Sequence, residues 1–598
     1  MPSFDGVRNA REAKSFAEAF HTTAAGVPER EAVRTFDGSV SLTWGEVRRR
    51  ADAIAGGLVK LGVARGDTVA LMLANRPEFQ LSDLAVMTAG AVPFSIYQTL
   101  PPEVIEYVVR DAGARVAIIE RAFEESFMKA RANLPTLEHV VVVDGGGEAG
   151  TLRLSEIEGS NPGFDVEAAT AAIGPDDLLT LIYTSGTTGP PKGVQLSHAN
   201  LMAAVRILNQ VITIPDRARV ISWLPAAHIA ERAANYYIPV AFGATITTLD
   251  TPRNIIQALP QVRPTFFFAV PRIWEKMKAG IETQLEGLPE EQRGLAQKAI
   301  AAGVHRVRLE QAGQVVPQEL AEVCARADEE LFSKLRAMLG LDAAVAVNTG
   351  AAPTPVDVLE FFHAIGIELA EVWGMSETTG AGTTNPPGRV RIGTVGPPAP
   401  EIEIRLDRDG EVLIRGPVVM TGYRNLPEKT REAFTEDGWL RTGDVGEFDS
   451  HGYLKIIDRK KELIINAAGK NMSPSNIESQ LKGASPFIGQ ACAIGDARPY
   501  TTALLVLDAD FVPSWAEKNG IQDTSLASLA RHEKVIAAVE EGVARANERL
   551  ARVEQIKKFH IVGGDWLPGG DELTPTMKLK RKPIAEKYAN EIEGMYAR

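Results

Sequence analysis

The chain contains the stretch Leu178-Leu179-Thr180-Leu181-Ile182-Tyr183-Thr184-Ser185-Gly186-Thr187-Thr188-Gly189-Pro190-Pro191-Lys192-Gly193-Val194. Its first residues are mostly apolar and predict a buried strand. Hydroxyl-bearing residues, glycines, prolines and one lysine follow, a composition typical of a loop that turns its N–H groups toward phosphate oxygens. The loop differs from the G-x-x-x-x-G-K-[ST] nucleotide motif, because Lys192 is followed by Gly193 rather than by Ser or Thr. The stretch therefore predicts a strand that leads into a phosphate-binding loop of another kind.

Length and composition limit what the protein can be. At 598 residues the chain is too long for one core, so we expect two or more domains. The net charge of −13 argues against nucleic-acid binding, which needs a basic surface. Cys324 and Cys492 are the only cysteines, which suits a reducing cytoplasm. We find no signal peptide and no run of 18 apolar residues, so we expect a cytoplasmic protein without a spanning helix. Contact with a membrane surface and the oligomeric state stay open.

Strands and helices alternate along most of the chain. Apolar runs such as residues 67–73 and 116–119 alternate with amphipathic patterns such as residues 44–61. This alternation predicts parallel-rich sheets covered by helices on both faces. From about residue 275 to 342 the sequence is rich in helix-forming residues and predicts a helical insertion.

The pattern changes near residue 395. Short alternating runs around Asp409-Gly410 indicate hairpins, and predict a small antiparallel subdomain over about residues 395–458. The pattern over residues 459–598 predicts a separate small α+β domain, which follows a short hinge. The predicted fold is thus α/β, with a large N-terminal domain (residues 1–458) of parallel-rich sheets and helices plus the antiparallel subdomain, followed by the small domain.

Six further stretches carry residues suited to nucleotide chemistry. They are Asn348-Thr349-Gly350-Ala351-Ala352-Pro353, Val372-Trp373-Gly374-Met375-Ser376-Glu377-Thr378, Thr442-Gly443-Asp444, Gly452-Tyr453-Leu454-Lys455-Ile456-Ile457-Asp458-Arg459, Ala468-Gly469-Lys470-Asn471-Met472-Ser473-Pro474 and Leu573-Thr574-Pro575-Thr576-Met577-Lys578-Leu579-Lys580-Arg581. Together with residues 183–194 they resemble the motifs of the AMP-forming acyl-CoA synthetases. This group belongs to the adenylate-forming superfamily, which includes luciferases and the adenylation domains of peptide synthetases. The resemblance runs from about residue 15 to the C-terminus.

The chemistry of this family explains why such residues are needed. A carboxylate that attacks the α-phosphate of ATP gains AMP as a leaving group and expels pyrophosphate. Phosphoryl transfer is catalysed mainly by positioning and by neutralising charge with Mg²⁺ and cationic side chains. The resemblance implies ATP, Mg²⁺ and CoA as cofactors or co-substrates, and a C-terminal domain that is mobile about a hinge at Asp458.

The resemblance also implies a role for each matched residue. Lys578, Glu377 and His228 are the implied catalytic residues, with Thr184 and Glu377 holding Mg²⁺. The implied ATP and AMP contacts are Thr184, Ser185, Gly186, Thr187, Thr188, Gly189, Lys192, Gly350, Ala351, Ala352, Trp373, Gly374, Ser376, Thr378, Asp444, Ile456 and Arg459. Ala468, Gly469 and Lys470 would line the tunnel for the CoA arm. Many family members have Ser-Gly before the C-terminal lysine, where this chain has Thr576-Met577. Aligning the family's Lys-x-x-Arg pattern assigns Lys578, with Arg581 in register, and leaves Lys580 and Lys582 as competitors.

Three features resemble the long-chain fatty acyl branch of the family. They are the string Leu224-Pro225-x-x-His228-x-x-Glu231-Arg232, the helical insertion and the form of residues 573–581. By this resemblance His228 lies beside the acyl carboxylate, and the expected substrates are a fatty acid, ATP and CoA. The alternatives are an acyl-AMP ligase that loads an acyl carrier protein, a synthetase for a shorter or aromatic acid, and a non-catalytic acyl- or nucleotide-binding protein.

Overall fold

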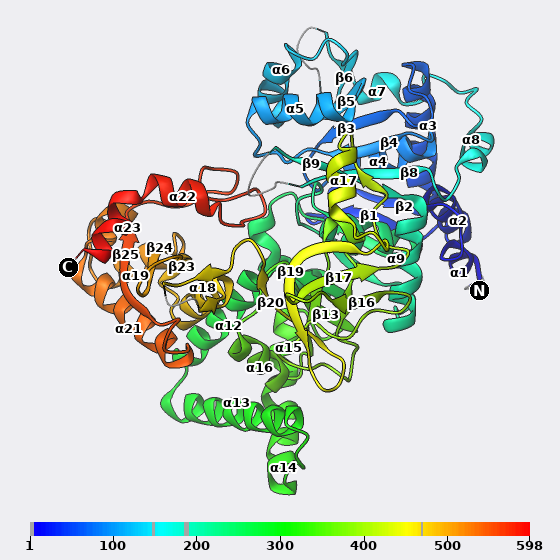
Figure 1. Ribbon diagram of the computed structural model, residues 1–598. Helices are drawn as coiled ribbons and strands as arrows, with labels where there is room; N and C mark the ends of the chain where they lie inside the picture. The colour runs from blue at the N-terminus through cyan, green and yellow to red at the C-terminus, as the bar shows by residue number, and fades with distance from the viewer. Residues whose placement is uncertain (1–4, 146–149, 185–189, 468–469, 598) are drawn as a thin grey trace.

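The computed structural model describes residues 5–145, 150–184, 190–467 and 470–597. A large N-terminal domain of mixed sheets and helices is followed by a smaller C-terminal domain, as predicted (Figure 1).

The largest sheet has eight strands in the order β18-β9-β8-β4-β3-β5-β6-β7. They are β3 (Thr68–Met72), β4 (Val92–Ser95), β5 (Val116–Ile119), β6 (His139–Val142), β7 (Leu152–Arg153), β8 (Leu178–Thr184), β9 (Lys192–Ser197) and β18 (Gly422–Tyr423). Strands β4, β3, β5 and β6 are parallel, whereas β9 returns antiparallel beside β8 and β18 pairs antiparallel with β9. The phosphate-loop stretch therefore forms a hairpin, a return strand that the apolar pattern did not indicate.

Helices cover both faces of this sheet. Alternate residues of β3 point to opposite sides, and both sets are apolar and buried. Val69 and Leu71 pack into the core beneath α3 (Trp44–Lys60) and α4 (Pro77–Thr88). The other face packs against α5 (Pro102–Ala112) and α6 (Glu124–Arg131). Helix α3 begins with the Thr43–Glu46 capping box, in which each side chain bonds the other residue's N–H.

Two further sheets complete the α/β part of the large domain. One holds β10 (Arg219–Ser222), β11 (Thr245–Thr248), β1 (Glu31–Thr35) and β2 (Ser41–Thr43). The other holds β12 (Phe266–Ala269), β13 (Ala346–Thr349), β14 (Leu369–Trp373) and β15 (Thr383–Thr384). Helices α12 (Pro271–Glu286), α13 (Glu290–Gln311), α14 (Gln318–Ala327) and α15 (Ser333–Leu339) lie between β12 and β13, and Figure 1 shows α13 and α14 projecting from the body of the protein.

An antiparallel sheet leads from the large domain to the small one. Its order is β16-β17-β19-β20, with β16 (Glu403–Leu406), β17 (Glu411–Arg415), β19 (Leu440–Phe448) and β20 (Leu454–Arg459). The turn between β16 and β17 uses Gly410 at φ 81°, a conformation that glycine adopts without strain.

The small domain has its own core on both faces of a three-stranded sheet. Strands β23 (Ile488–Ile494), β24 (Thr501–Leu507) and β25 (Ile556–Val562) pack against α18 (Pro474–Ala484) and α21 (Glu533–Arg549) on one face. Helices α22 (Arg581–Lys587) and α23 (Ala589–Tyr596) cover the other face. Helix α21 ends at Arg549, and Asn547 bonds both the N–H and the C=O of Ile556 where the chain turns into β25.

The other helices and strands connect or cover the sheets described above. They are α1 (Asp5–Ala10), α2 (Phe16–Gly26), η1 (Arg121–Phe123), α7 (Leu154–Ile157), α8 (Val166–Ala172), α9 (His198–Val211), η2 (Glu231–Tyr237), α10 (Ile238–Ala241), η3 (Pro252–Asn254), α11 (Ile255–Val262), η4 (Asp328–Phe332), α16 (Val356–Ala364), η5 (Ser376–Thr378), α17 (Pro427–Ala433), β21 (Ile464–Ile465), β22 (Asn471–Met472), α19 (Phe511–Lys518) and α20 (Leu526–Leu529). Among the described helices none is long and apolar enough to cross a bilayer.

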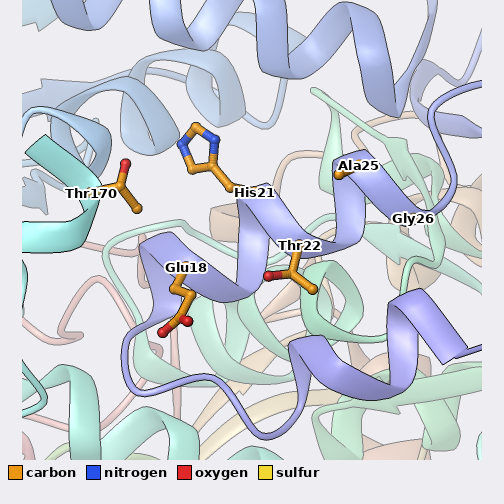
Figure 2. Close-up of a pocket in the computed structure, with 6 residues that line it drawn as sticks. All are labelled: Glu18, His21, Thr22, Ala25, Gly26 and Thr170. Atoms are coloured by element: carbon orange, nitrogen blue, oxygen red, sulfur yellow. The ribbon is translucent and has the colours of Figure 1, made fainter. Parts of the chain in front are cut away.

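A surface hollow lies beside α2 near the N-terminus. Figure 2 shows its lining residues, which are Glu18, His21, Thr22, Ala25, Gly26 and Thr170. Burial and the nearby charge of Arg48 lower the pKa of His21 to about 4. None of the motif residues lines this hollow, so it is separate from the site described below.

A buried ion pair joins α4 to the π-helix η2. Arg232 and Asp83 are fully buried and their side chains lie 2.8 Å apart. The guanidinium also donates to the hydroxyl of Ser95 at 2.8 Å and to the carbonyl of Ala226 at 3.1 Å. The pair thus links the large sheet to the loop that precedes η2.

Removing one partner of this pair should be costly. Arg232→Met leaves the Asp83 carboxyl buried without its counter-charge, and we expect a loss of about 3–5 kcal/mol in unfolding free energy. Urea unfolding followed by tryptophan fluorescence measures it. Arg30→Met is the control, because the Arg30–Asp216 pair is partly exposed and such pairs contribute about 0–1 kcal/mol. Equal losses in the two variants would contradict this interpretation.

Candidate active site

The β8–β9 hairpin presents Thr184 and Lys192 at the ends of its two strands. The hydroxyl of Thr184 donates to the carbonyl of Lys192 at 3.4 Å. A Cβ at Gly193 would come within 3.0 Å of the Tyr183 ring, so only glycine fits there without movement. The loop residues Ser185, Gly186, Thr187, Thr188 and Gly189 lie outside the described residues. The predicted phosphate loop thus starts and ends on paired strands of the main sheet.

Lys192 and Glu377 both contact one tyrosine. The Lys192 ammonium lies 4.1 Å from the centre of the Tyr423 ring. The Tyr423 hydroxyl donates to Glu377 Oε1 at 2.8 Å. Glu377 is buried in the 3-10 turn η5, and burial lowers the pKa of Lys192 while the charge of Glu377 opposes that shift. The phosphate-loop lysine and the predicted metal ligand therefore belong to one site.

The carboxylate of Asp444 is held by two donors. Trp373 Nε1–H donates to Asp444 Oδ2 at 2.8 Å, and Arg459 Nε lies 3.3 Å from Oδ1. Asp444 is buried, so the two contacts fix the orientation of its carboxylate. A Cβ at Gly374 would lie 2.3 Å from the carbonyl of Gly380, which explains glycine beside this tryptophan.

The small-residue loop follows β13. A Cβ at Gly350 would lie 3.0 Å from the carbonyl of Val372, so the loop packs closely on β14. Ala351 has a φ of 71° and is exposed, as is Ala352. Glu371 was missed by the sequence analysis. It accepts a hydrogen bond from the N–H of Thr354 at 3.2 Å, and burial raises its pKa to about 7.

The remaining predicted nucleotide contacts lie around η5 and β20. Ser376 is half-buried at the start of η5. The Thr378 hydroxyl donates to the carbonyl of Met375 at 3.2 Å, so it serves the turn itself. Ile456 on β20 packs against the core shared by β9 and the antiparallel sheet.

Lys578 sits in a tight turn of the small domain. The N–H of Lys578 donates to Thr574 Oγ1 at 3.0 Å, and its carbonyl accepts from the N–H of Thr574 at 2.8 Å. Met577 has a φ of 64°, the region in which glycine is favoured. Met577 therefore has the backbone conformation that suits the glycine of the Ser-Gly found before this lysine in many family members. Arg581 anchors it by a two-pronged pair with Glu478 at 2.6 and 3.0 Å.

Charged groups of the large domain influence the Lys578 ammonium. Its pKa is lowered by burial and by the charge of Arg459, while Asp444 and Glu377 act in the opposite direction. The other two candidate lysines, Lys580 and Lys582, have partners within the small domain. The Lys580 ammonium donates to the carbonyl of Gly570 at 2.8 Å, and Lys582 is exposed beside Glu586. Of the three, Lys578 is the lysine that the structure brings to the large domain's carboxylates.

His228 lies close enough to Lys578 to be affected by its charge. Burial lowers the pKa of His228 to about 4, and the Lys578 charge adds to the shift. Its Nδ1 accepts from the N–H of Ala230 at 3.1 Å, which assigns the proton of the neutral ring to Nε2. Glu231 accepts from the N–H of Leu224 at 3.0 Å and so holds the loop that carries His228. His228 is thus a neutral donor within reach of the Lys578 charge.

Asp458 joins the last strand of the antiparallel sheet to the small domain. Its backbone pairs with Val445 on β19. Its buried carboxylate accepts from Ser473 Oγ at 2.6 Å and from the N–H and hydroxyl of Ser475, both at 3.0 Å. Lys470 is exposed, and Ala468 and Gly469 lie outside the described residues.

Known sequences match both parts of the chain. Residues 20–424 match the AMP-binding enzyme family, and residues 461–598 match the AMP-binding enzyme C-terminal domain. The chain belongs to the AMP-binding enzyme family. The predicted resemblance is therefore confirmed.

Several relatives of this family member are named as fatty-acid ligases. FadD11 of Mycobacterium tuberculosis (strain ATCC 25618 / H37Rv), which carries a provisional name as a fatty-acid–CoA ligase, is 49% identical over 451 residues, 75% of this chain and 79% of its own. FadD15 of the same strain, a long-chain-fatty-acid–CoA ligase, is 35% identical over 583 residues, 94% of each chain. The long-chain-fatty-acid–CoA ligase ACSBG1 of Rattus norvegicus is 32% identical and covers 91% of this chain and 80% of its own.

Solved structures share the fold. The anthranilate CoA ligase AuaEII in complex with anthranoyl-AMP gives a TM-score of 0.72 at 20% identity, over 98% of this chain and 99% of its own. The adenylation domain of a carboxylate reductase from Mycobacterium chelonae gives a TM-score of 0.75 at 20% sequence identity, over 100% of this chain and 94% of its own. These likenesses confirm the predicted fold class.

The protonation state of His228 is testable. A histidine in water has a pKa of about 6.5, so we expect the His228 NMR signal to stay in its neutral form down to pH 5 and to titrate near pH 4. His228→Gln identifies the signal. Lys578→Ala should raise the pKa of His228, because a nearby positive charge is removed while burial remains.

The lowered pKa of His228 also makes the stability of the fold depend on pH. The unfolded chain binds the proton more readily, so His228 makes folding less favourable as the pH falls from about 6.5 toward 4. A His228 titration midpoint between pH 6 and 7 would contradict the buried, neutral assignment.

Proposed function

We propose that the protein is an ATP-dependent long-chain fatty acid–CoA ligase. In the first half-reaction a fatty acid carboxylate attacks the α-phosphate of ATP and forms acyl-AMP with release of pyrophosphate. In the second, the CoA thiol attacks the acyl carbon and AMP leaves. The observation that carries the proposal is that the charge of Lys578, in the small domain, acts on His228 and is itself influenced by Glu377 and Asp444, all three in the large domain.

Each residue of this group has a matching task in adenylation. The carboxylate and the polyphosphate are both anionic, so a cation between them stabilises the approach and the transition state. Lys578 supplies that cation, and His228 donates from Nε2 to the acyl carboxylate. Asp444, oriented by Trp373, accepts the ribose hydroxyls, and Lys192 binds the outer phosphates.

The residues fit a magnesium ion. Among the described residues only the Tyr423 hydroxyl hydrogen-bonds to the Glu377 carboxylate, and it uses one oxygen. The second oxygen is a hard anionic ligand of the kind Mg²⁺ prefers, and the Thr184 hydroxyl is the second predicted ligand. When bound, Mg²⁺ would neutralise charge on the phosphates.

We further propose that residues 459–598 rotate about Asp458 between the half-reactions, with residues 1–458 as the fixed part. The CoA arm needs a path beside Ala468, Gly469 and Lys470, and Lys578 must withdraw. Arg272 pairs with Asp508, and Lys276 with Asp510 at 2.7 Å, so these contacts between large and small domain would break on rotation. The Lys276–Asp510 pair is partly exposed on both sides, and such pairs contribute only about 0–1 kcal/mol.

Substrate preference tests the function directly. We expect pyrophosphate release to rise from short to long saturated fatty acids, because each buried CH₂ group contributes about 0.8 kcal/mol. Release is measured over acids of graded length, with benzoate as an aromatic control. A maximum at acetate or benzoate would reject the long-chain assignment and leave adenylation intact.

The acceptor needs a second assay. With radiolabelled palmitate and ATP, we expect acyl-CoA when CoA is supplied and no acylated protein when an acyl carrier protein replaces it. Loading of the carrier protein would favour the acyl-AMP ligase alternative. No pyrophosphate release with any acid would favour a non-catalytic binding protein.

A further inference from the structure

The Tyr423 side chain touches both Glu377 and Lys192, the two charged groups beside the predicted phosphate loop. Its hydroxyl donates to Glu377 Oε1 at 2.8 Å, and its ring lies 4.1 Å from the Lys192 ammonium. The side chain is buried. Neither contact could be inferred from the motif residues, because Tyr423 lies 46 residues after Glu377 in the chain.

The backbone around Tyr423 is fixed to the strand that carries Lys192. Tyr423 pairs with Val194 across β18 and β9, and its N–H donates to Thr430 Oγ1 at 2.9 Å. The next residue, Arg424, donates its N–H to the carbonyl of Gly193 at 2.7 Å. These contacts fix the backbone that carries the Tyr423 ring to the strand that carries Lys192.

This arrangement keeps two opposite charges apart. If Lys192 and Glu377 formed a direct ion pair, each would neutralise the group that the other needs for phosphate or metal. Within the described part of the chain no ion pair joins them, although the Glu377 charge acts on Lys192. The ring face attracts the ammonium more weakly than a carboxylate would, so phosphate can displace that contact. The hydroxyl occupies one carboxylate oxygen of Glu377 and leaves the other available.

We propose that Tyr423 is a positioning residue for adenylation. Its hydroxyl sets the orientation of the Glu377 carboxylate toward Mg²⁺, and its ring holds Lys192 ready for the outer phosphates of ATP. This role rests on the proposed function for its chemistry. The two contacts concern only the pyrophosphate end of ATP. A change at Tyr423 should therefore affect binding of ATP but not of AMP, and adenylation but not thioester formation.

Two substitutions separate the hydroxyl from the ring. Tyr423→Phe keeps the ring and removes the hydrogen bond to Glu377, and Tyr423→Leu removes both contacts. Tyr500→Phe is the control, because its hydroxyl donates to the carbonyl of Met595 in the small domain. Binding of ATP and of AMP is measured by calorimetry over a range of Mg²⁺ concentrations without fatty acid, so that no turnover is needed. Thioester formation from synthetic acyl-AMP and CoA is measured separately.

For Tyr423→Phe we expect the Mg²⁺ concentration that half-saturates ATP binding to rise about tenfold, the size typical of a lost hydrogen bond to a charged group. Binding of AMP and thioester formation should stay at the wild-type level. Tyr423→Leu should weaken ATP binding further, and Tyr500→Phe should change nothing. An unchanged Mg²⁺ dependence in Tyr423→Phe, or equal losses for ATP and AMP, would overturn the proposal. Because these are binding measurements, they decide the role of Tyr423 even if no fatty acid proves to be a substrate.

Discussion

A carboxylate and a triphosphate repel each other, and a site that joins them depends on a cation placed between them. We propose that Lys578 is that cation in this protein. It comes from the small domain, while Asp444, Glu377 and His228 all come from the large one. In the proposed mechanism, the adenylation site is therefore complete only when the two domains adopt the orientation seen in this structure.

The cost of holding Lys578 in place is spread over several contacts. Burial and Arg459 both disfavour its charge, and the carboxylates of Asp444, Glu377 and Glu462 offset this. Met577 adopts a left-handed backbone conformation, which costs about 1 kcal/mol for a residue with a Cβ. The Arg581–Glu478 pair anchors the same turn. By contrast, the Lys276–Asp510 pair between the domains is partly exposed and can break at little cost.

The sequence predicted the parts of the site that lie in continuous strings. The apolar run before Thr184 is strand β8, and the Trp373 and Asp444 strings lie on β14 and β19, strands of two different sheets whose side chains meet in one hydrogen bond. It did not predict Tyr423, Glu371 or the partners of Asp458, because those contacts join residues distant in sequence and carry no periodic signal. The Lys-x-x-Arg spacing assigns Lys578 over Lys580 and Lys582, and the structure adds that Lys580 bonds to Gly570 and that Lys582 pairs with Glu586.

The most direct measurement compares the two half-reactions in Lys578→Ala. Adenylation is followed by pyrophosphate release with palmitate, and thioester formation by acyl-CoA production from synthetic palmitoyl-AMP and CoA. Loss of a transition-state electrostatic contact costs about 10²–10³ in rate, and we expect that loss in adenylation alone, with thioester formation near the wild-type rate. Lys582→Ala, which removes an exposed lysine four residues away, should affect neither step. Equal slowing of both steps in Lys578→Ala would contradict a lysine that serves adenylation and then withdraws.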